Sequence, residues 1–455
     1  MADSLNMTRG KPMRLLFFFA LPLMFGNVFQ QLYTVVDTAV VGRGVGMDAL
    51  AALGTVDWLN WLFFGIVQGY TQGFSVRISQ KFGKGDLPGM KKVAGQSAFL
   101  CVILAVVVTT LGLSLLPLFF KLLKMPENLQ GMAGLYVRIL LMGFPAVVFF
   151  NYCASLLRAV GNSKAPLYAM IAASAVNIGL DFLTVFVLKW GIAGAALATV
   201  SAQIFSGLVC FLYLRKMPEL HFKKKDFLPD KASCKDLVQL GTPLFAKNTV
   251  IAFGGMMVQS VVNSFSLSFI AGFTATNKLY GLLEIAAISY NHAVTTYVGQ
   301  NYGASRLDRV KEGMKSAALL GVLTAVGIGA IMLVFGRPIT MLFISREDPL
   351  LAMEAGNIAY WYLSAMSVSL PALYMLFVFQ AGLQGIGHTL ATFLSGIIEF
   401  ALRVSLSFLV AYTGFQHGIF GAEVSAWWGA GIYLMITFGC KYKKICKKQE
   451  RAGIE

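Results

Sequence analysis

Long uncharged blocks are the feature that most constrains how this chain can fold. Between Lys92 and Lys121 lie 28 consecutive residues without a charged side chain, and similar blocks recur along all 455 residues. A helix needs about 20 apolar residues to cross a bilayer. Because backbone polar groups must be satisfied within the segment that crosses lipid, these blocks predict an all-α integral membrane protein.

The apolar blocks predict twelve transmembrane helices. Their approximate ranges are 14–41, 49–76, 93–120, 131–157, 165–188, 191–214, 237–262, 268–299, 316–336, 355–381, 389–412 and 418–440. The predicted organisation is an N-terminal six-helix lobe (1–220), a cytoplasmic linker (221–235), a C-terminal six-helix lobe (236–440) and a basic cytoplasmic tail (441–455).

The basic residues predict the orientation of the chain. Of the 37 lysines and arginines, 27 fall in the N-terminus, alternate loops and the tail on one side, and six fall on the other side. This bias places both termini in the cytoplasm of a multi-pass protein of the bacterial cell membrane. Because these charges lie at the ends of apolar runs, the net charge of +16 indicates a lipid bilayer as partner rather than nucleic acid.

The chain also repeats itself across the linker. Three pairs of elements recur at a spacing that drifts slowly between 220 and 227: Pro22 with Pro243, QKFG at 80–83 with QNYG at 300–303, and GIAG at 191–194 with GIFG at 418–421. Because each lobe has an even number of spans, both lobes enter from the same side. We therefore predict a pseudo-two-fold axis along the membrane normal, as in parallel-repeat transporters.

The first predicted span combines a proline with an acid. Pro22 has no N–H and crowds the carbonyl of Phe18, so we expect a bend in the helix there. Asp37 follows fifteen residues later, at membrane depth. An acid in that position is costly and usually faces a cavity or a partner.

Three polar residues share the depth of Asp37. Asn177 and Asp181 are four residues apart, so they lie on one helix face. Asp181 and Thr199 are each nine residues from the turn near Trp190, which places both roughly 13 Å from the outer end of a helical hairpin. The cluster of these three residues with Asp37 predicts a binding site for Na⁺ or a proton. The alternative is that the acids are structural and that Asn177 and Thr199 join helices.

The second lobe lacks this cluster but carries other charges. By the repeat, Asp37 corresponds to Val258 and Asp181 to Ser407. Glu399 and Arg403, four residues apart, predict an ion pair with either a structural or a gating role. Glu284 could attract a cationic substrate or balance a lysine.

Enzymatic and cofactor-dependent functions find no support in the sequence. No nucleophile–base set or group of metal ligands shares one depth, and the phosphate-binding pattern GxxxxGK[ST] is missing from the 455 residues. His292 and His388 stand apart from other ligand types. We expect no cofactor beyond a transported Na⁺ or H⁺, and a monomer that binds a small organic molecule.

The segment PLMFGNVFQQLYTVVDTAVVGRGVGMDALAALG resembles the first span of the multidrug and toxic compound extrusion (MATE) transporters, and so do the elements QKFG and LLRAVGNSKAP. The similarity is greatest to the bacterial branches and covers nearly the whole chain. It implies two six-helix bundles forming a V around a central cavity. It also implies a cation site at Asp37, Asn177, Asp181 and Thr199. Some members carry acids in spans seven and ten, which this chain lacks there.

The function expected from this resemblance is a Na⁺- or H⁺-coupled antiporter that exports amphiphilic, often cationic, organic compounds by alternating access. The alternative is a flippase for lipid-linked saccharide precursors, which shares the architecture of the superfamily. A flippase would need a more cationic cavity for a pyrophosphate headgroup, and Lys247, Lys278 and Arg403 could provide it.

Overall fold

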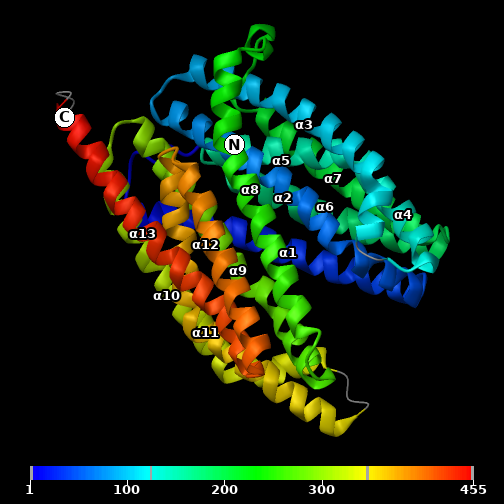
Figure 1. Cartoon of the computed structure of the whole chain (residues 1–455). Helices are drawn as coiled ribbons and strands as arrows, with labels where there is room; N and C mark the ends of the chain where they lie inside the picture. The colour runs from blue at the N-terminus through cyan, green and yellow to red at the C-terminus, as the bar shows by residue number, and fades with distance from the viewer. Residues whose placement is uncertain (1–3, 123–124, 345–347, 452–455) are drawn as a thin grey trace. The chain divides into compact units, whose positions relative to one another are not determined.

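The computed structural model describes residues 4–122, 125–344 and 348–451, and these residues are almost entirely helical (Figure 1). The helices of the first half are α1 (Pro12–Gly44), α2 (Met47–Gly83), α3 (Leu87–Leu122), α4 (Glu127–Met142), α5 (Phe144–Ala159), α6 (Lys164–Asp181), a π-helix (Phe182–Val187) and α7 (Gly191–Arg215). Those of the second half are α8 (Lys231–Val262), α9 (Leu267–Gly303), α10 (Leu307–Thr340), α11 (Pro349–Gly385), α12 (Thr389–Thr413) and α13 (Phe420–Arg451).

Close contacts divide the chain into two compact units. The first unit contains Leu21–Phe245 and the N-terminal residues up to Asn6, and the second contains Met7–Ala20 and Ala246–Glu455. The boundary therefore runs through α1 and α8, the two helices that carry Pro22 and Pro243 in their interiors.

The described helices agree with the twelve predicted spans. Nine of them are long and apolar enough to cross a membrane, and the bent pair α4 and α5 makes a tenth span. The remaining two spans are α8 and α9, which have 32 and 37 residues but do not reach the same hydropathy over a membrane-spanning window. Their lower hydropathy follows from the charged residues within them, including Lys247 on α8 and Glu284 on α9.

The sequence repeat reappears in the helix bounds. Helices α2 and α9 each have 37 residues and end at the last glycine of QKFG and of QNYG. The turns before α6 and α12 contain Gly161 and Gly387, which have φ of 89° and 84°. Only glycine adopts this left-handed conformation without strain, which explains why both positions carry it.

Two predicted spans differ from the structure. The predicted span 131–157 is present but broken into two helices, because α4 and α5 meet at Gly143 with a bend of 45°. A Cβ atom on Gly143 would lie 2.3 Å from Val200 Cγ2, so glycine permits α7 to approach closely at the break. The predicted span 165–188 also changes at Phe182 from α-helix to π-helix.

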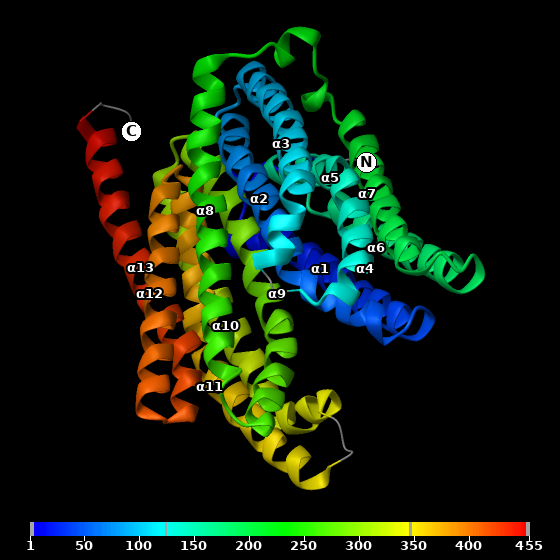
Figure 2. The same cartoon turned by 45° about the vertical axis from the view of Figure 1, so that its right-hand side comes forward.

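The linker between α7 and α8 is docked on α3, as Figure 2 shows at one end of the first unit. The buried side chain of Gln96 on α3 donates from Nε2 to the carbonyl of Leu228 at 2.5 Å and accepts at Oε1 from Asp230 N at 2.8 Å. A Cβ atom on Gly95 would lie 2.0 Å from the carbonyl oxygen of Asp226. At Gly95 the backbone of the linker therefore packs directly against the helix.

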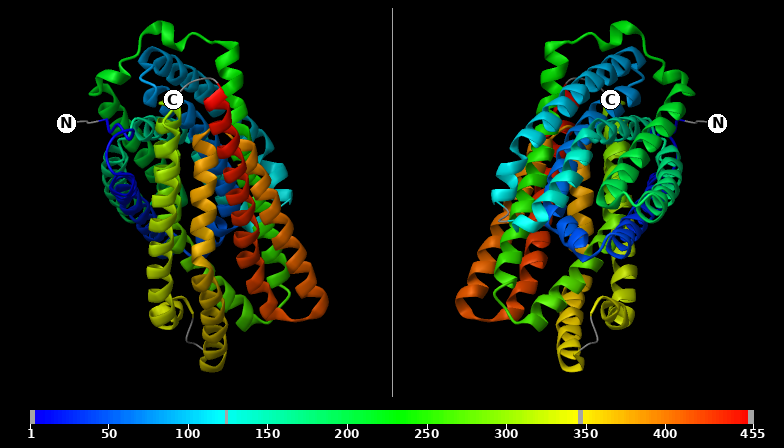
Figure 3. Two further views of the ribbon diagram at one scale, coloured as in Figure 1. Left: turned by 90° about the vertical axis from the view of Figure 1, so that its left-hand side faces the viewer. Right: turned by 90° about the vertical axis from the view of Figure 1, so that its right-hand side faces the viewer.

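In the second unit α11 is the core helix. It packs against α9, α10 and α13, and Figure 3 shows it beside α13. Of the most apolar window of α11, 61% is buried, against 17% for α10. Because α10 is more apolar than α11 yet far more exposed, we assign its outer surface to lipid.

Candidate functional site

The first predicted site lies at the end of α6, inside the first unit. Asn177 and Asp181 are both 0% exposed, one helical turn apart, and Asp181 is the last α-helical residue. The following six residues form the π-helix Phe182–Val187. π-Helical turns are rare and occur frequently at functional sites. The matching helix of the second unit, α12, is α-helical throughout its 25 residues, so the π-helix belongs to the half with the acid.

Thr184 is a further candidate residue for this site, which the sequence reasoning missed. It lies within the π-helix, it is 6% exposed, and its hydroxyl makes no hydrogen bond among the described residues. A Cβ atom on Gly194 of α7 would lie 2.8 Å from Thr184 Oγ1, so glycine at this position leaves room for the hydroxyl beside α7. The signal for this contact in the sequence was the repeated GIAG element, whose last residue is Gly194.

The polar atoms of α6 lack hydrogen-bonding partners among the described residues. Both carboxylate oxygens of Asp181 and both amide atoms of Asn177 are buried without one. Burying a polar group without a hydrogen bond costs roughly 1–3 kcal/mol in proteins. Such atoms are expected where a cation, a proton or a water molecule completes the site.

Asp37 on α1 is an electrostatic neighbour of Asp181. Two carboxylates attract each other only when a proton or a cation lies between them. The structure thus brings together the two acids that the sequence assigned to one site.

Tyr33 is a second residue that the sequence reasoning missed. It precedes Asp37 by one turn on α1 and interacts electrostatically with both Asp37 and Asp181. Its spacing of four residues from Asp37 was a signal in the sequence. The half-buried Tyr33 therefore adds a phenol to the two carboxyl groups.

The structure supports Thr199 as a site residue less strongly than it supports Asp37, Asn177 and Asp181. It is half-buried on α7, the helix that packs along α6. One turn further along α7, Gln203 is 8% exposed, and its Oε1 makes no hydrogen bond among the described residues. The oxygen-bearing side chains at this level are therefore Asp37, Asn177, Asp181, Thr184 and, on α7, Thr199 or Gln203. Carboxylate, amide and hydroxyl oxygens are the ligands that hard cations prefer.

Pro22 lies in the interior of α1, as predicted. Helix α1 makes fewer close backbone contacts with other helices than α6 does. It approaches the α6 region closely at two glycines: a Cβ atom on Gly26 would lie 3.0 Å from Met170 Sδ, and one on Gly44 would lie 2.4 Å from Val185 Cγ1 of the π-helix. The helix that carries Asp37 is therefore less restrained than α6, which carries Asp181.

The predicted pair of Glu399 and Arg403 is present in the second unit, but it is part of a larger set. Arg403 Nη2 lies 3.5 Å from Glu399 Oε2 and 2.7 Å from Glu423 Oε2 of α13. Arg403 Nε also donates to both Glu423 oxygens at 3.0 Å. The sequence thus predicted the weaker partner and missed the stronger one, because Glu423 lies twenty residues away on another helix.

Lys247 of α8 extends this set. Its Nζ lies 3.9 Å from Glu399 Oε1, donates to Gln380 Oε1 and sits 5.7 Å from the ring centroid of Phe377. A Cβ atom on Gly396 would lie 2.7 Å from Lys247 Cγ, so glycine makes room for the lysine stem beside α12. Lys247 and Arg403 are therefore both ion-paired, and they do not form the free cationic surface that a flippase would need.

Glu284 lies on α9 and is half-buried. Its Oε1 accepts a hydrogen bond of 2.7 Å from the hydroxyl of Tyr280, one turn earlier. Lys278, on the same helix, is exposed. Glu284 thus lies near the charged set without a cation in direct contact among the described residues.

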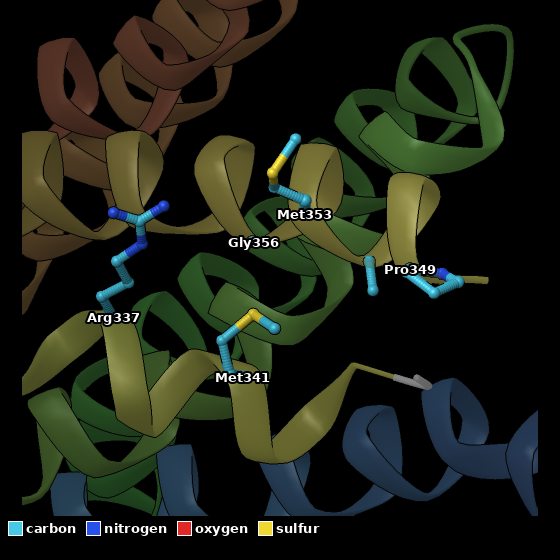
Figure 4. A pocket seen from close by; sticks show the side chains of 6 residues that line it. Arg337, Met341, Pro349, Met353 and Gly356 are labelled. Carbon is cyan, nitrogen blue, oxygen red and sulfur yellow. The ribbon is translucent and has the colours of Figure 1, made fainter. Parts of the chain in front are cut away.

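A pocket of 410 Å³ opens between the end of α10 and the start of α11 (Figure 4). Its lining residues are Arg337, Met341, Pro349, Ala352, Met353 and Gly356. Arg337 Nη2 donates to Asn357 Oδ1 at 2.9 Å, so its charge is already engaged. The predicted site residues lie elsewhere, and we do not assign the coupling site to this pocket.

The family model MatE matches residues 22–183 and 243–409 of the chain. The two matched segments begin at Pro22 and at Pro243, the two prolines of the repeat. Together they cover well over half of the chain.

Individual proteins are similar over nearly the whole length. The "Probable multidrug resistance protein YoeA" of Bacillus subtilis (strain 168) is 28% identical, with 95% of this chain and 94% of that protein covered. The "Probable multidrug resistance protein NorM" of Thermotoga maritima is 26% identical, with 89% and 87% covered. The solved structure of a MOP superfamily transporter from Pyrococcus furiosus has a TM-score of 0.90 at 22% identity, with 97% of this chain and 98% of that chain covered.

Proposed function

Because the chain belongs to the MatE family of membrane transporters, we propose that it is an antiporter that exports amphiphilic, often cationic, organic compounds in exchange for Na⁺ or H⁺. It acts in the bacterial cell membrane with both termini in the cytoplasm. It is a transporter and not an enzyme. The names of its relatives, which are multidrug resistance proteins, support the substrate class.

One observation carries the coupling proposal. Asp181 is fully buried, its two oxygens have no hydrogen-bond donor among the described residues, and its electrostatic neighbour is another carboxyl group, Asp37. Such a pair is stable in a membrane when it holds one positive charge. Binding of Na⁺ or H⁺ draws α1 towards α6, and release restores the repulsion between the carboxyl groups.

The two acids differ in how firmly they are held. Asp181 belongs to α6, which packs along α7, whereas Asp37 belongs to the loosely packed α1 with its proline. Loss of the cation therefore moves α1 rather than α6. We propose that this movement, at Pro22, is the step that changes access from one side of the membrane to the other.

The flippase alternative is disfavoured by the charges of the second unit. Lys247 and Arg403 are neutralised by Glu399 and Glu423 at distances of 2.7 to 3.9 Å. A pyrophosphate headgroup requires cations that are free to pair with it. The exposed Lys278 alone does not provide such a site.

The test is transport by the full chain in proteoliposomes. We expect a Na⁺ or pH gradient, imposed separately, to drive export of a fluorescent cationic dye, and the effective gradient identifies the coupling ion. Asp37→Asn and Asp181→Asn should each lower gradient-driven export at least tenfold. Asp48→Asn, an exposed acid at the start of α2, serves as the matched control. If both site variants kept export and its ion dependence, the proposed coupling site would be wrong.

A further inference from the structure

A cavity of 470 Å³ opens in the first unit between the end of α3 and the first turns of α4. Part of its wall is apolar and buried: Leu116, Phe120 and Met125 are 2%, 8% and 5% exposed. The same cavity is lined by two exposed cations, Lys121 of α3 and Arg138 of α4. Its volume is that of a small-molecule site, about 300–1,000 Å³. It shares no residue with the candidate coupling site.

The cavity has a counterpart in the repeat, the pocket of 410 Å³ between α10 and α11. Pro117 lies inside α3 and Pro338 inside α10, at a spacing of 221 (338 − 117). Gly131 lines the first cavity and Gly356 the second, at a spacing of 225 (356 − 131). The hollow at this end of each unit therefore belongs to the duplicated scaffold.

The two cations do not belong to that scaffold. At a spacing of 221, Lys121 corresponds to Leu342, and at a spacing of 225, Arg138 corresponds to Leu363. The arginine that lines the second-unit pocket, Arg337, is engaged by a hydrogen bond of 2.9 Å. Among the described residues, neither Lys121 nor Arg138 makes a hydrogen bond or an ion pair. The first unit thus adds two unengaged positive charges to a hollow that the second unit also has.

Arg138 lies on a face of α4 that is turned towards lipid. Leu135, three residues earlier, and Met142, four residues later, share this face and are 45% and 62% exposed. Arg138 is seven residues into the predicted span 131–157, roughly 10 Å along the helix axis. A charged side chain among lipid-facing residues at this depth is costly unless an opposite charge or water reaches it. An anion in the cavity would supply that opposite charge.

The chemistry of the lining selects an amphiphilic phosphate. Side chains of a helix lean towards its N-terminus, so Arg138 leans towards the start of α4. With both termini in the cytoplasm, that end lies at the outer surface of the membrane, at the level of the lipid headgroups. A guanidinium binds a phosphate through two parallel hydrogen bonds, and a lysine adds a point charge. The apolar wall beside these cations suits methylene groups.

We propose that this cavity binds an anionic phospholipid of the outer leaflet, whose phosphate pairs with Lys121 and Arg138 and whose first methylene groups lie on Leu116 and Phe120. Gly131 leaves the cavity open, because a Cβ atom added there would meet nothing within 4 Å. The inference rests on the proposed function for the orientation of the chain alone, and it needs no transport. A free phosphate ion would use the two cations but not the apolar wall, so the lipid is the better fit.

The test is native mass spectrometry of the purified full-length protein in a non-ionic detergent, titrated with dioleoyl phosphatidylglycerol. We expect the unchanged protein to retain one phosphatidylglycerol molecule that Lys121→Gln/Arg138→Gln binds about tenfold less tightly. Zwitterionic dioleoyl phosphatidylcholine should bind both proteins alike. Arg43→Gln, which removes an exposed arginine in the last turn of α1, should behave as the unchanged protein.

A second variant fills the cavity and keeps both charges. Gly131→Leu should lose the same lipid without a lower unfolding temperature, because its Cβ atom meets nothing and leucine favours a helix over glycine. Retention of the lipid by both Gly131→Leu and the double variant would overturn the inference. Displacement of the lipid by inorganic phosphate would also overturn it, since the ligand would then be a free anion.

The outcome is independent of the coupling site. If dye export survived in both Asp37→Asn and Asp181→Asn, the proposed coupling would be wrong, and the difference in phosphatidylglycerol binding would still stand. If the coupling variants lost export and the lipid bound the double variant as tightly as the unchanged protein, the lipid site alone would fall.

Discussion

Arg403 holds Glu423 of α13 more closely than it holds Glu399, which lies one turn earlier on its own helix: the shortest distances are 2.7 and 3.5 Å. Nε and Nη2 of the guanidinium both donate to Glu423. This arrangement joins α12 to α13 and turns a local pair into a connection between helices.

The first prediction concerns this connection. Glu423→Gln should destabilise the protein by about 3–5 kcal/mol, because it leaves the buried Arg403 without its closest counter-charge. The double variant Arg403→Gln/Glu423→Gln should lose less than the sum of the two single variants, since neither charge is left unpaired. Thermal unfolding of the purified protein in detergent measures all three. Strictly additive losses would show that the pair does not act as a unit.

The second prediction concerns Thr184. Thr184→Val removes the hydroxyl and keeps the shape, so the concentration of coupling cation at half-maximal transport should rise about tenfold, which corresponds to one lost ligand. Thr184→Ser should remain near the unchanged value. Because the hydroxyl makes no hydrogen bond among the described residues, Thr184→Val should not lower the unfolding temperature.

A matched control for Thr184 is Thr71 of α2, a buried threonine whose hydroxyl donates to the Val67 carbonyl at 2.8 Å. Thr71→Val should leave the cation dependence unchanged and reduce stability slightly. An equal effect of both substitutions on cation dependence would remove Thr184 from the site.

The acids of the first unit could be predicted from the sequence because a single acid within a long apolar run is easily recognised. Asp37 and Asp181 stand alone in long apolar runs, and the equal distances of Asp181 and Thr199 from the turn near Trp190 gave the depth of the second acid. The helices and the repeat were predicted for the same reason, since length and hydropathy determine what crosses a bilayer. The shared site of Asp37 and Asp181 thus followed from spacing alone.

Contacts between distant residues could not be predicted in this way. Glu423 is twenty residues from Arg403, and Lys247 more than 150 residues from Glu399, so no helical spacing connects them. The π-helix after Asp181 depends on how Thr184 packs against Gly194 of the next helix. The break at Gly143 likewise depends on the approach of Val200. Each of these features arises from packing between helices.

The third prediction compares the two prolines of the repeat. Pro22→Ala restores a backbone N–H that can bond to the Phe18 carbonyl, so it should stabilise a straight α1 and lower the rate of dye export several-fold. Pro243→Ala makes the same change in α8, where Val258 stands in place of Asp37. It should affect export less, because no coupling acid follows. Equal losses in the proteoliposome assay would mean that both prolines serve transport alike.

The fourth prediction concerns the linker, outside the membrane. Asp230 accepts a hydrogen bond of 2.6 Å from the Ser233 hydroxyl and pairs with Lys92 at 3.1 Å. These contacts lower the pKa of Asp230 from 3.8 to about 2. Since the pKa is lower in the folded state, the stabilisation is fully present above the unfolded value. It is lost as the pH falls from 3.8 through about 2.

Hydrogen exchange of the linker amides, corrected for the intrinsic pH dependence of exchange, measures this loss. Protection of residues 224–230 should decline over that interval in the unchanged protein and be reduced at every pH in Asp230→Asn. Asp226→Asn provides a contrast, because the Asp226 carboxylate bonds to the Lys223 amide within the linker rather than to α3. If protection in Asp230→Asn matched the unchanged protein at neutral pH, docking would depend on Gln96 and not on the Asp230–Lys92 pair, since the Gln96 hydrogen bonds to the linker backbone do not titrate.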